Sequence, residues 1–142
     1  MTVAAEQYPF LVVDPRQGPA GLKPILPLTL SLSQQSVPAQ GLLDTAAAVN
    51  VLPHQLGVLL GAVWEQQTVS LRLTGNLAAY EARALLLGAT VGKFPPVNLA
   101  FAWTRTDEVP LLLGQVNFFM EFDACFFRAR GLFEIRPKQT MP

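Results

Sequence analysis

The chain has 142 residues, of which 51% are hydrophobic and 14% charged, and its ten basic and ten acidic residues cancel to a net charge of zero. This length fits one domain that buries about two thirds of its unfolded surface. Because no basic patch is available to neutralise phosphates, nucleic acid is not an expected partner, whereas the high apolar content favours self-association.

Pro and Gly are dense in the first 27 residues, so we predict an N-terminal arm or linker at 1–23, a domain at 24–137 and a tail at 138–142. Alternating or wholly apolar runs between turn residues predict strands. In chain order, these strands span residues 8–13, 26–33, 36–44, 47–52, 68–78, 79–92 (as one strand or more), 97–104, 109–114, 124–129 and 132–136.

Two short helices complete the prediction, one opened by Pro53 at 53–61 and one of a turn or two at 115–122. We expect Trp64 and Trp103 to pack in the core or at an interface. Many short strands and few helices predict an all-β fold, either closed or two-layered. No apolar window approaches the roughly 18 residues of a membrane-spanning helix, and no signal-peptide pattern opens the chain, so we expect no membrane association and a cytoplasmic location.

The most informative stretch is GLLDTAAAVNVLP at residues 41–53, where an apolar run delivers Asp44 and Thr45 into a turn of small residues. A carboxylate buried at the end of an apolar strand is costly unless it is hydrogen-bonded, paired or used in chemistry. Two interpretations follow from this turn. Asp44 is either a functional acid or the side chain of an Asx-turn that bonds its own backbone between two strands.

Other chemistry has little support in the sequence. Cys125 and His54 are the single cysteine and histidine, so we expect no disulfide, no zinc site and no metal, and no glycine-rich nucleotide-binding motif is present. A Cys–His nucleophile pair is formally available. However, Cys125 lies in the apolar stretch FDACFFRA, where a thiol is expected to be inert core.

Two elements of the chain together resemble the retropepsin-like aspartic peptidases. The first is LLDTAA at 42–47, a D-[TS]-x-A turn that ends an apolar strand, and the second is LLGQVNFF at 112–119, about 70 residues further on. Their order, spacing and strand context carry the resemblance, which covers roughly residues 24–137. It implies an acid-protease fold, a closed β-barrel with one lobe per chain.

The resemblance also implies a mechanism without metal or organic cofactor. In this family two aspartates share one proton, because adjacent like charges do not both ionise cheaply. One carboxylate activates water and the protonated partner polarises the scissile carbonyl. Since Asp14, Asp107 and Asp123 do not repeat the turn of Asp44, a catalytic protein must be a homodimer with one Asp44 from each chain, acting on a peptide or protein substrate.

The family's active-site loop maps onto Asp44, Thr45, Ala46 and Ala47. Thr45 resembles the hydroxyl residue that bonds across the dimer axis, although a plain turn threonine remains an alternative. Ala46 stands where the family usually has glycine, and its methyl group is expected to crowd the catalytic water. Viral members often pair an arginine after the second-element glycine with an acid, but here these positions are Gln115 and Ala48, so the chain resembles a cellular or bacterial branch.

Two further segments are assigned roles by the same resemblance. Leu112, Leu113 and Gly114 resemble the strand end that packs behind the catalytic loop, where glycine permits close backbone approach. Residues 74–76 (Thr74, Gly75 and Asn76) are a possible flap tip that closes over substrate and excludes water. An ordinary exposed hairpin turn is the alternative for this segment.

Three functions are therefore weighed. The leading hypothesis is a homodimeric aspartic endopeptidase that cleaves extended peptides under a flap. The alternative, motivated by Ala46, is an attenuated or inactive module of the same fold that binds peptides or dimerises. A small nucleic-acid-binding barrel is disfavoured by the zero net charge.

Overall fold

The structure is a computed structural model that describes residues 3–139, and most of its regular segments are β-strands. The strands are β1 Glu6–Pro9, β2 Leu11–Val12, β3 Leu22–Lys23, β4 Ile25–Leu32, β5 Gln35–Leu43, β6 Asn50–Leu52, β7 Ser70–Leu71, β8 Ala82–Thr90, β9 Val97–Thr104, β10 Leu112–Leu113, β11 Phe122–Phe127 and β12 Leu132–Pro137. The α-helices are α1 His54–Leu59 and α2 Phe118–Glu121, and the 3-10 helices are η1 Pro15–Gly21, η2 Trp64–Gln66, η3 Gly75–Leu77 and η4 Arg128–Arg130.

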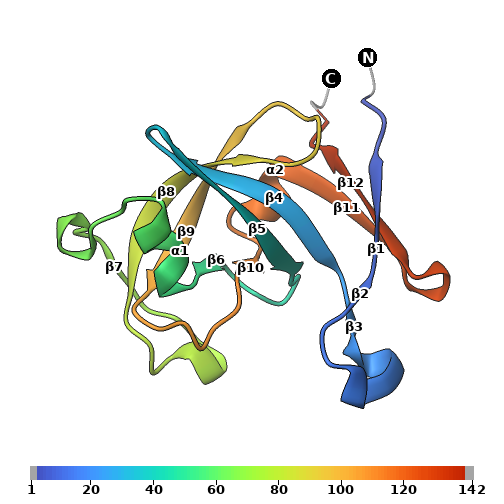
Figure 1. Ribbon diagram of the computed structural model, residues 1–142, viewed down its shortest axis with the longest axis horizontal. Helices are drawn as coiled ribbons and strands as arrows, with labels where there is room; N and C mark the ends of the chain where they lie inside the picture. Colours follow the sequence, from blue (N-terminus) through green and yellow to red (C-terminus); the bar gives the residue numbers. More distant parts are fainter. Residues whose placement is uncertain (1–2, 140–142) are drawn as a thin grey trace.

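The larger part of the molecule is a closed β-barrel. Among the described residues, six strands pair in the order β4, β5, β10, β6, β9 and β8, and β8 pairs back onto β4 to close the ring. Strand β7 pairs with the first two residues of β8, Ala82 and Arg83. The barrel occupies the left and centre of Figure 1. This arrangement confirms the all-β closed barrel expected from the sequence.

A second, three-stranded sheet lies beside the barrel, on the right of Figure 1. Its order is β1, β12 and β11, so the first strand pairs with the last one, with Glu6 opposite Ile135 and Pro9 opposite Leu132. The two terminal regions are therefore joined by a strand ladder.

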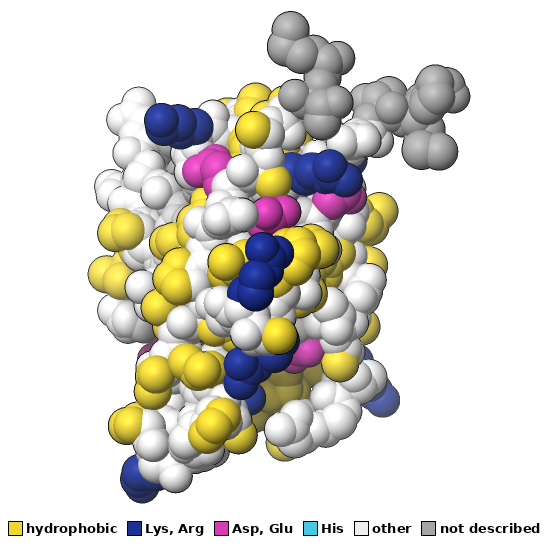
Figure 2. Space-filling model, turned by 90° about the vertical axis from the view of Figure 1, so that its right-hand side faces the viewer, with side chains coloured by type: hydrophobic (Ala, Val, Ile, Leu, Met, Phe, Trp, Pro, Cys, Tyr) yellow, Lys and Arg dark blue, Asp and Glu magenta, His cyan; other side chains and the backbone are white. Residues whose placement is uncertain are grey.

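On the right-hand face of the molecule, charged side chains of both signs are scattered among hydrophobic ones (Figure 2).

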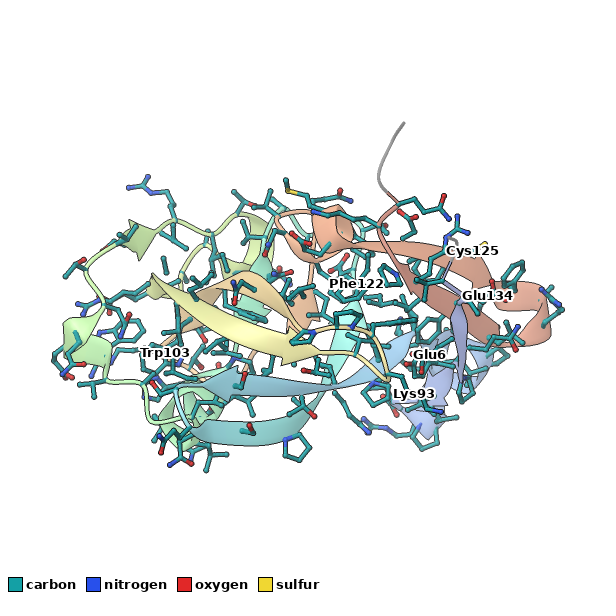
Figure 3. All side chains as sticks on the ribbon, turned by 90° about the horizontal axis from the view of Figure 1, so that it is seen from above. Glu6, Lys93, Trp103, Phe122, Cys125 and Glu134 are labelled. Carbon is teal, nitrogen blue, oxygen red and sulfur yellow. The ribbon has the colours of Figure 1, made fainter. Side chains whose placement is uncertain are left out.

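One apolar core connects the barrel with the three-stranded sheet. In β4 the buried residues are Leu26, Leu28 and Leu30, while Pro27 and Thr29 between them are exposed, as the period of two in a strand requires. Phe118 of α2 stacks on Phe122 of β11, with ring centroids 4.9 Å apart (Phe122 is labelled in Figure 3). Helix α2 thus fills the space between the two sheets.

Several predicted elements have the expected limits. Strand 97–104 is found unchanged as β9, strand 26–33 is β4 shifted by one residue, and the helix from Pro53 is α1. Trp103 and Trp64 are 0% and 4% exposed, which confirms core packing for both. Three predicted strands are too long: of 47–52, 68–78 and 109–114, only 50–52, 70–71 and 112–113 are strands.

The prediction that Cys125 is buried core is wrong, because Cys125 is exposed. Strand β11 belongs to the three-stranded sheet, where Phe122 is buried and Ala124 packs against the core. Since side chains alternate along a strand, Asp123 and Cys125 lie on the opposite, solvent-facing side. The apolar run was therefore a half-buried strand and not a fully buried one.

Between residues 3 and 139, no helix has the length and apolar character needed to cross a membrane. The same part of the chain contains no group of three His, Cys, Asp or Glu side chains placed to hold a metal ion.

Candidate active site

The candidate site is built where three strands of the barrel meet. Strand β10 lies between β5, to which it is parallel, and β6, to which it is antiparallel, with Leu113 beside Leu43 and Leu112 opposite Val51. Asp44 follows the end of β5, and its backbone N–H donates to the carbonyl oxygen of Leu113 at 3.0 Å. The two elements that carry the family resemblance are thus adjacent in space.

The loop that begins at Asp44 is held by hydrogen bonds at both ends. The N–H of Ala46 donates to Oδ1 of Asp44 at 3.0 Å, and the N–H of Ala47 donates to the Asp44 carbonyl at 3.1 Å. Gln115 then joins the loop to the chain after β10: its N–H donates to the Ala47 carbonyl at 2.9 Å and its Nε2 to the Thr45 carbonyl at 2.7 Å. The loop position is therefore fixed by its own backbone and by the second element.

The bond from Ala46 to Oδ1 is the Asx-turn contact considered for Asp44 from the sequence. It is compatible with both interpretations, because it orients one carboxylate oxygen and leaves the other unused. Within residues 3–139, Oδ2 of Asp44 makes no hydrogen bond or ion pair. The Asp44 side chain is half-buried, so its free oxygen is available to a ligand in a partly desolvated position.

Gly114 lies where the two elements cross, and the crossing leaves no room for a side chain. A Cβ at this position would lie 2.5 Å from the Val49 carbonyl oxygen and 2.7 Å from that of Ala47. Backbone oxygens cannot move aside as a flexible side chain can. The glycine therefore permits the close backbone approach on which the loop geometry depends.

A pair of asparagines, which the sequence analysis missed, supports this crossing from behind. Asn50 is 0% exposed; its Oδ1 accepts from the N–H of Gly114 at 2.8 Å, and its Nδ2 donates to the Ala100 carbonyl at 3.0 Å. The Oδ1 of Asn117 accepts from the Ala100 N–H at 2.9 Å. The signal in the sequence was a single polar residue, Asn50, inside the otherwise apolar run AAAVNVL.

A cavity of about 520 Å³ opens in front of the loop. One wall comes from the loop and the barrel strands, and the opposite wall comes from the segment between β7 and β8; both lie on the lower side of the barrel in Figure 1. Its lining residues are Leu42, Asp44, Ala46, Ala47, Ala48, Val49, Val51, Arg72, Leu73, Thr74, Gly75, Asn76, Leu77, Pro110 and Leu112.

This cavity brings together most of the residues expected at the site. Asp44, Ala46, Ala47 and Leu112 face the possible flap tip at 74–76 across it. Leu113 and Gly114 are buried behind the loop and do not line the cavity, while Thr45 is exposed beside it. The sequence analysis did not single out Arg72, the second charged residue of the lining.

The possible flap is short and exposed at its tip. Thr74, Gly75 and Asn76 are all exposed, and Gly75 has a φ of 65°, which suits glycine. At the base of the segment, the Tyr80 hydroxyl donates to Oε2 of Glu108 at 3.0 Å. This hydrogen bond to Glu108 raises the pKa of Tyr80 above its ordinary value.

A larger hollow of about 650 Å³ lies elsewhere, between β1 and the strands β4 and β5. The acid in its lining, Glu6, accepts a hydrogen bond from the N–H of Lys93 at 3.1 Å (Figure 3). Because this carboxylate is occupied by the adjacent loop and the hollow is more open, we place the site at Asp44 and not here.

The alternative Cys–His pair does not form. His54 stacks on Trp103 with ring centroids 5.3 Å apart, whereas Cys125 is on β11. Trp103 and Cys125 lie toward opposite ends of the molecule in Figure 3. A thiol–imidazole nucleophile is therefore excluded by distance.

Comparison with known proteins shows a similarity in fold. No protein-family model matches the chain, and no curated protein matches it. Among solved structures, it is similar to the crystal structure of a retropepsin-like aspartic protease from Rickettsia conorii, with a TM-score of 0.61 over 93% of this chain and 98% of that chain. The chain has a retropepsin-like fold. The sequence identity is 17%, so the similarity concerns the fold.

Two features distinguish the loop from the pattern that the family resemblance leads us to expect. Ala46 lines the cavity next to Asp44, so its methyl group occupies space that glycine would leave open. Gln115 stands where viral members often have an arginine that pairs with an acid at the position of Ala48. Here the Gln115 amide donates to the Thr45 carbonyl instead. The loop is thus buttressed by a neutral amide.

Proposed function

We propose that this protein is a homodimeric aspartic endopeptidase in which two Asp44 carboxylates, one from each chain, activate a water molecule. The observation that carries the proposal is the position of Asp44: a half-buried acid on a hydrogen-bonded loop, with one oxygen unused, facing a cavity of about 520 Å³ with a flap-like wall opposite. The retropepsin-like fold supports the same assignment.

The proposed chemistry needs two carboxyl groups with one proton between them. The ionised carboxylate takes a proton from water as the water attacks the scissile carbonyl, and the protonated partner donates to the carbonyl oxygen. Collapse of the tetrahedral intermediate then transfers a proton to the leaving nitrogen. Because one chain supplies one such acid, the second must come from another copy across a two-fold axis.

Exposed groups around the loop are suited to such an interface. Thr45 is exposed, and in the described part of the chain its hydroxyl makes no hydrogen bond, so it is available to a partner. Val116, which is bonded through its N–H to the Ala48 carbonyl, is 51% exposed, and Met120 of α2 is 59% exposed. A second copy would cover these apolar side chains. The apolar lining of the cavity favours an extended peptide as substrate.

The direct test is peptide cleavage by Asp44→Asn beside a matched control, Asp123→Asn, which removes an exposed carboxylate of β11 remote from the cavity. We expect Asp44→Asn to abolish cleavage of a proteome-derived peptide library and Asp123→Asn to leave it unchanged. Cleavage by Asp44→Asn at the wild-type rate would contradict the proposal.

Mixing experiments test the shared site. If equal amounts of wild-type and Asp44→Asn chains exchange freely, only wild-type pairs are active, so activity per total chain falls to about a quarter. An active monomer would retain about half. The two expectations differ most clearly when activity is followed over a series of mixing ratios.

A second candidate function is a peptide-binding or dimerising module with attenuated catalysis, and the methyl group of Ala46 in the cavity favours it. Misplacing a reacting group by about 1 Å can cost on the order of 100-fold in rate. We expect Ala46→Gly to raise kcat by about tenfold or more if this crowding limits the wild type. No cleavage by either protein, with retained peptide binding, would favour the binding module.

A further inference from the structure

Arg72 occupies an unusual position at the site. It directly follows β7, lies on the flap side of the cavity and is exposed. The next residue, Leu73, is only 6% exposed and packs in an apolar cluster with Val51 and Leu112 of the opposite wall. The backbone that carries Arg72 is therefore anchored, while its side chain borders open space.

The Arg72 guanidinium has no protein partner in the described part of the chain, since no carboxylate oxygen lies within 4.0 Å and no hydrogen bond is formed. Some other arginines are occupied: Arg16 pairs with Asp14, and Arg83 donates to the Trp64 carbonyl at 2.8 Å. Glu81 also borders a hollow on the outer side of the flap with Arg72, yet the two do not pair. The charge is thus available to a ligand.

Asp44 and Arg72 are the two ionisable residues among the described residues that line the cavity. When a flap closes over a peptide, water is expelled and an unpaired cation becomes costly. A peptide carboxylate within reach removes that cost through a charge-assisted hydrogen bond, which a guanidinium makes well. A neutral side chain at the same place does not.

We propose that Arg72 is a specificity-determining residue that selects an acidic side chain, Asp or Glu, at one position on each side of the scissile bond, beside apolar residues. This inference rests on the proposed function for the identity of the site. In a two-fold dimer the two Arg72 residues lie on either side of the paired acids, so the preference applies once on each side of the scissile bond.

The first experiment profiles cleavage of a proteome-derived peptide library by wild type, Arg72→Gln, Arg72→Glu and the control Arg130→Gln. Arg130 is an exposed arginine of η4, which does not line the cavity. We expect an enrichment of Asp or Glu at one position on each side of the scissile bond, and a loss of about tenfold in the kcat/KM of these acidic peptides in Arg72→Gln. In Arg72→Glu we expect the preference to switch toward Lys or Arg. The control should keep the wild-type profile.

A second experiment separates this inference from the proposed function. Pooled octapeptides that differ only by Glu or Gln at a scanned position are captured on immobilised Asp44→Asn protein and on its Arg72→Gln derivative. Preferential retention of Glu peptides that disappears in the Arg72→Gln derivative supports the inference even if the wild type cleaves nothing. Equal retention of Glu and Gln peptides, or a cleavage profile indifferent to Arg72, overturns it while leaving the peptidase proposal intact.

Discussion

The two walls of the cavity are built differently. On the wall that carries Asp44, the Asp44 N–H donates to the Leu113 carbonyl of β10, and Gln115, just after β10, donates to carbonyls of the loop. The buried amide of Asn50 holds Gly114 from behind. The opposite wall has a two-residue strand, β7, followed by an exposed 3-10 turn around Gly75. We call the first the floor and the second the flap.

This difference suits two separate tasks of a peptidase, which are to position the catalytic carboxylate and to admit and cover the substrate. A carboxylate that activates water must be held in place before the substrate arrives, since a small displacement is expensive in rate. A flap must move to admit a peptide and then close over it. Changes in the floor should therefore reduce stability and activity together, whereas changes in the flap should act mainly on substrate binding.

The largest expected difference between the two walls is the loss of stability when one methyl group is added to each. In Gly114→Ala the new Cβ meets backbone oxygens at 2.5 Å and 2.7 Å, so we expect a loss of about 3 kcal/mol in unfolding free energy, with loss of activity. In Gly75→Ala nothing lies within 4 Å, and only the positive φ of 65° is unfavourable, which costs about 1 kcal/mol.

Urea unfolding of the two glycine variants measures the difference. Equal destabilisation by both, or a fully stable Gly114→Ala protein, would contradict the division into floor and flap.

A smaller effect is expected from removing the amide that supports the floor. Asn50→Ala leaves the buried N–H of Gly114 and the Ala100 carbonyl without their partner, so we expect a loss of roughly 1–3 kcal/mol. The control is Asn98→Ala, because Asn98 is exposed and its side chain makes no hydrogen bond among the described residues. Thermal unfolding compares them, and a control as destabilised as Asn50→Ala would contradict this role.

The smallest effect on stability is expected at the base of the flap. Tyr80→Phe removes the hydroxyl bond to Glu108, so we expect KM to rise about threefold with little change in melting temperature, in line with the modest net value of a hydrogen bond.

The pH dependence of this contact follows from the raised pKa of Tyr80. Because the folded pKa lies above the ordinary tyrosine value of 10.0, the contact is fully present below about pH 10 and is lost as the pH rises through the folded pKa. Steady-state kinetics up to pH 9 should therefore show a constant ratio of mutant to wild-type KM. A ratio of mutant to wild-type KM that falls to one as the pH rises toward 9 would argue against the Tyr80 contact.

The sequence was sufficient to predict the strands whose side chains alternate. Leu26, Leu28 and Leu30 mark β4, and the limits of β9 were predicted without error. The stretch 68–78 was predicted as one strand because Leu71 and Leu73 also alternate. These leucines pack into the small apolar cluster beside the cavity, but only 70–71 pair with β8, so the alternation reflects burial and not a ladder.

The candidate site was predictable only in part, because its parts come together through crossings between distant segments. Asp44 and Gly114 were found because a resemblance joined them, and residues 74–76 because a glycine–asparagine turn suggested a tip. Asn50 was marked only as a polar residue in an apolar run, and its role depends on a bond to a residue 64 positions away. Arg72 gave no signal, because its role depends on a cavity that exists only after folding.

The central claim is that two Asp44 side chains form one site between two chains. The measurement that tests it most directly is native mass spectrometry of the protein titrated with a statine-type transition-state analogue. We predict a complex of two chains with one inhibitor molecule, absent in Asp44→Asn. A single chain that binds one inhibitor by itself, or a chain that stays alone and unliganded at high concentration, would contradict it.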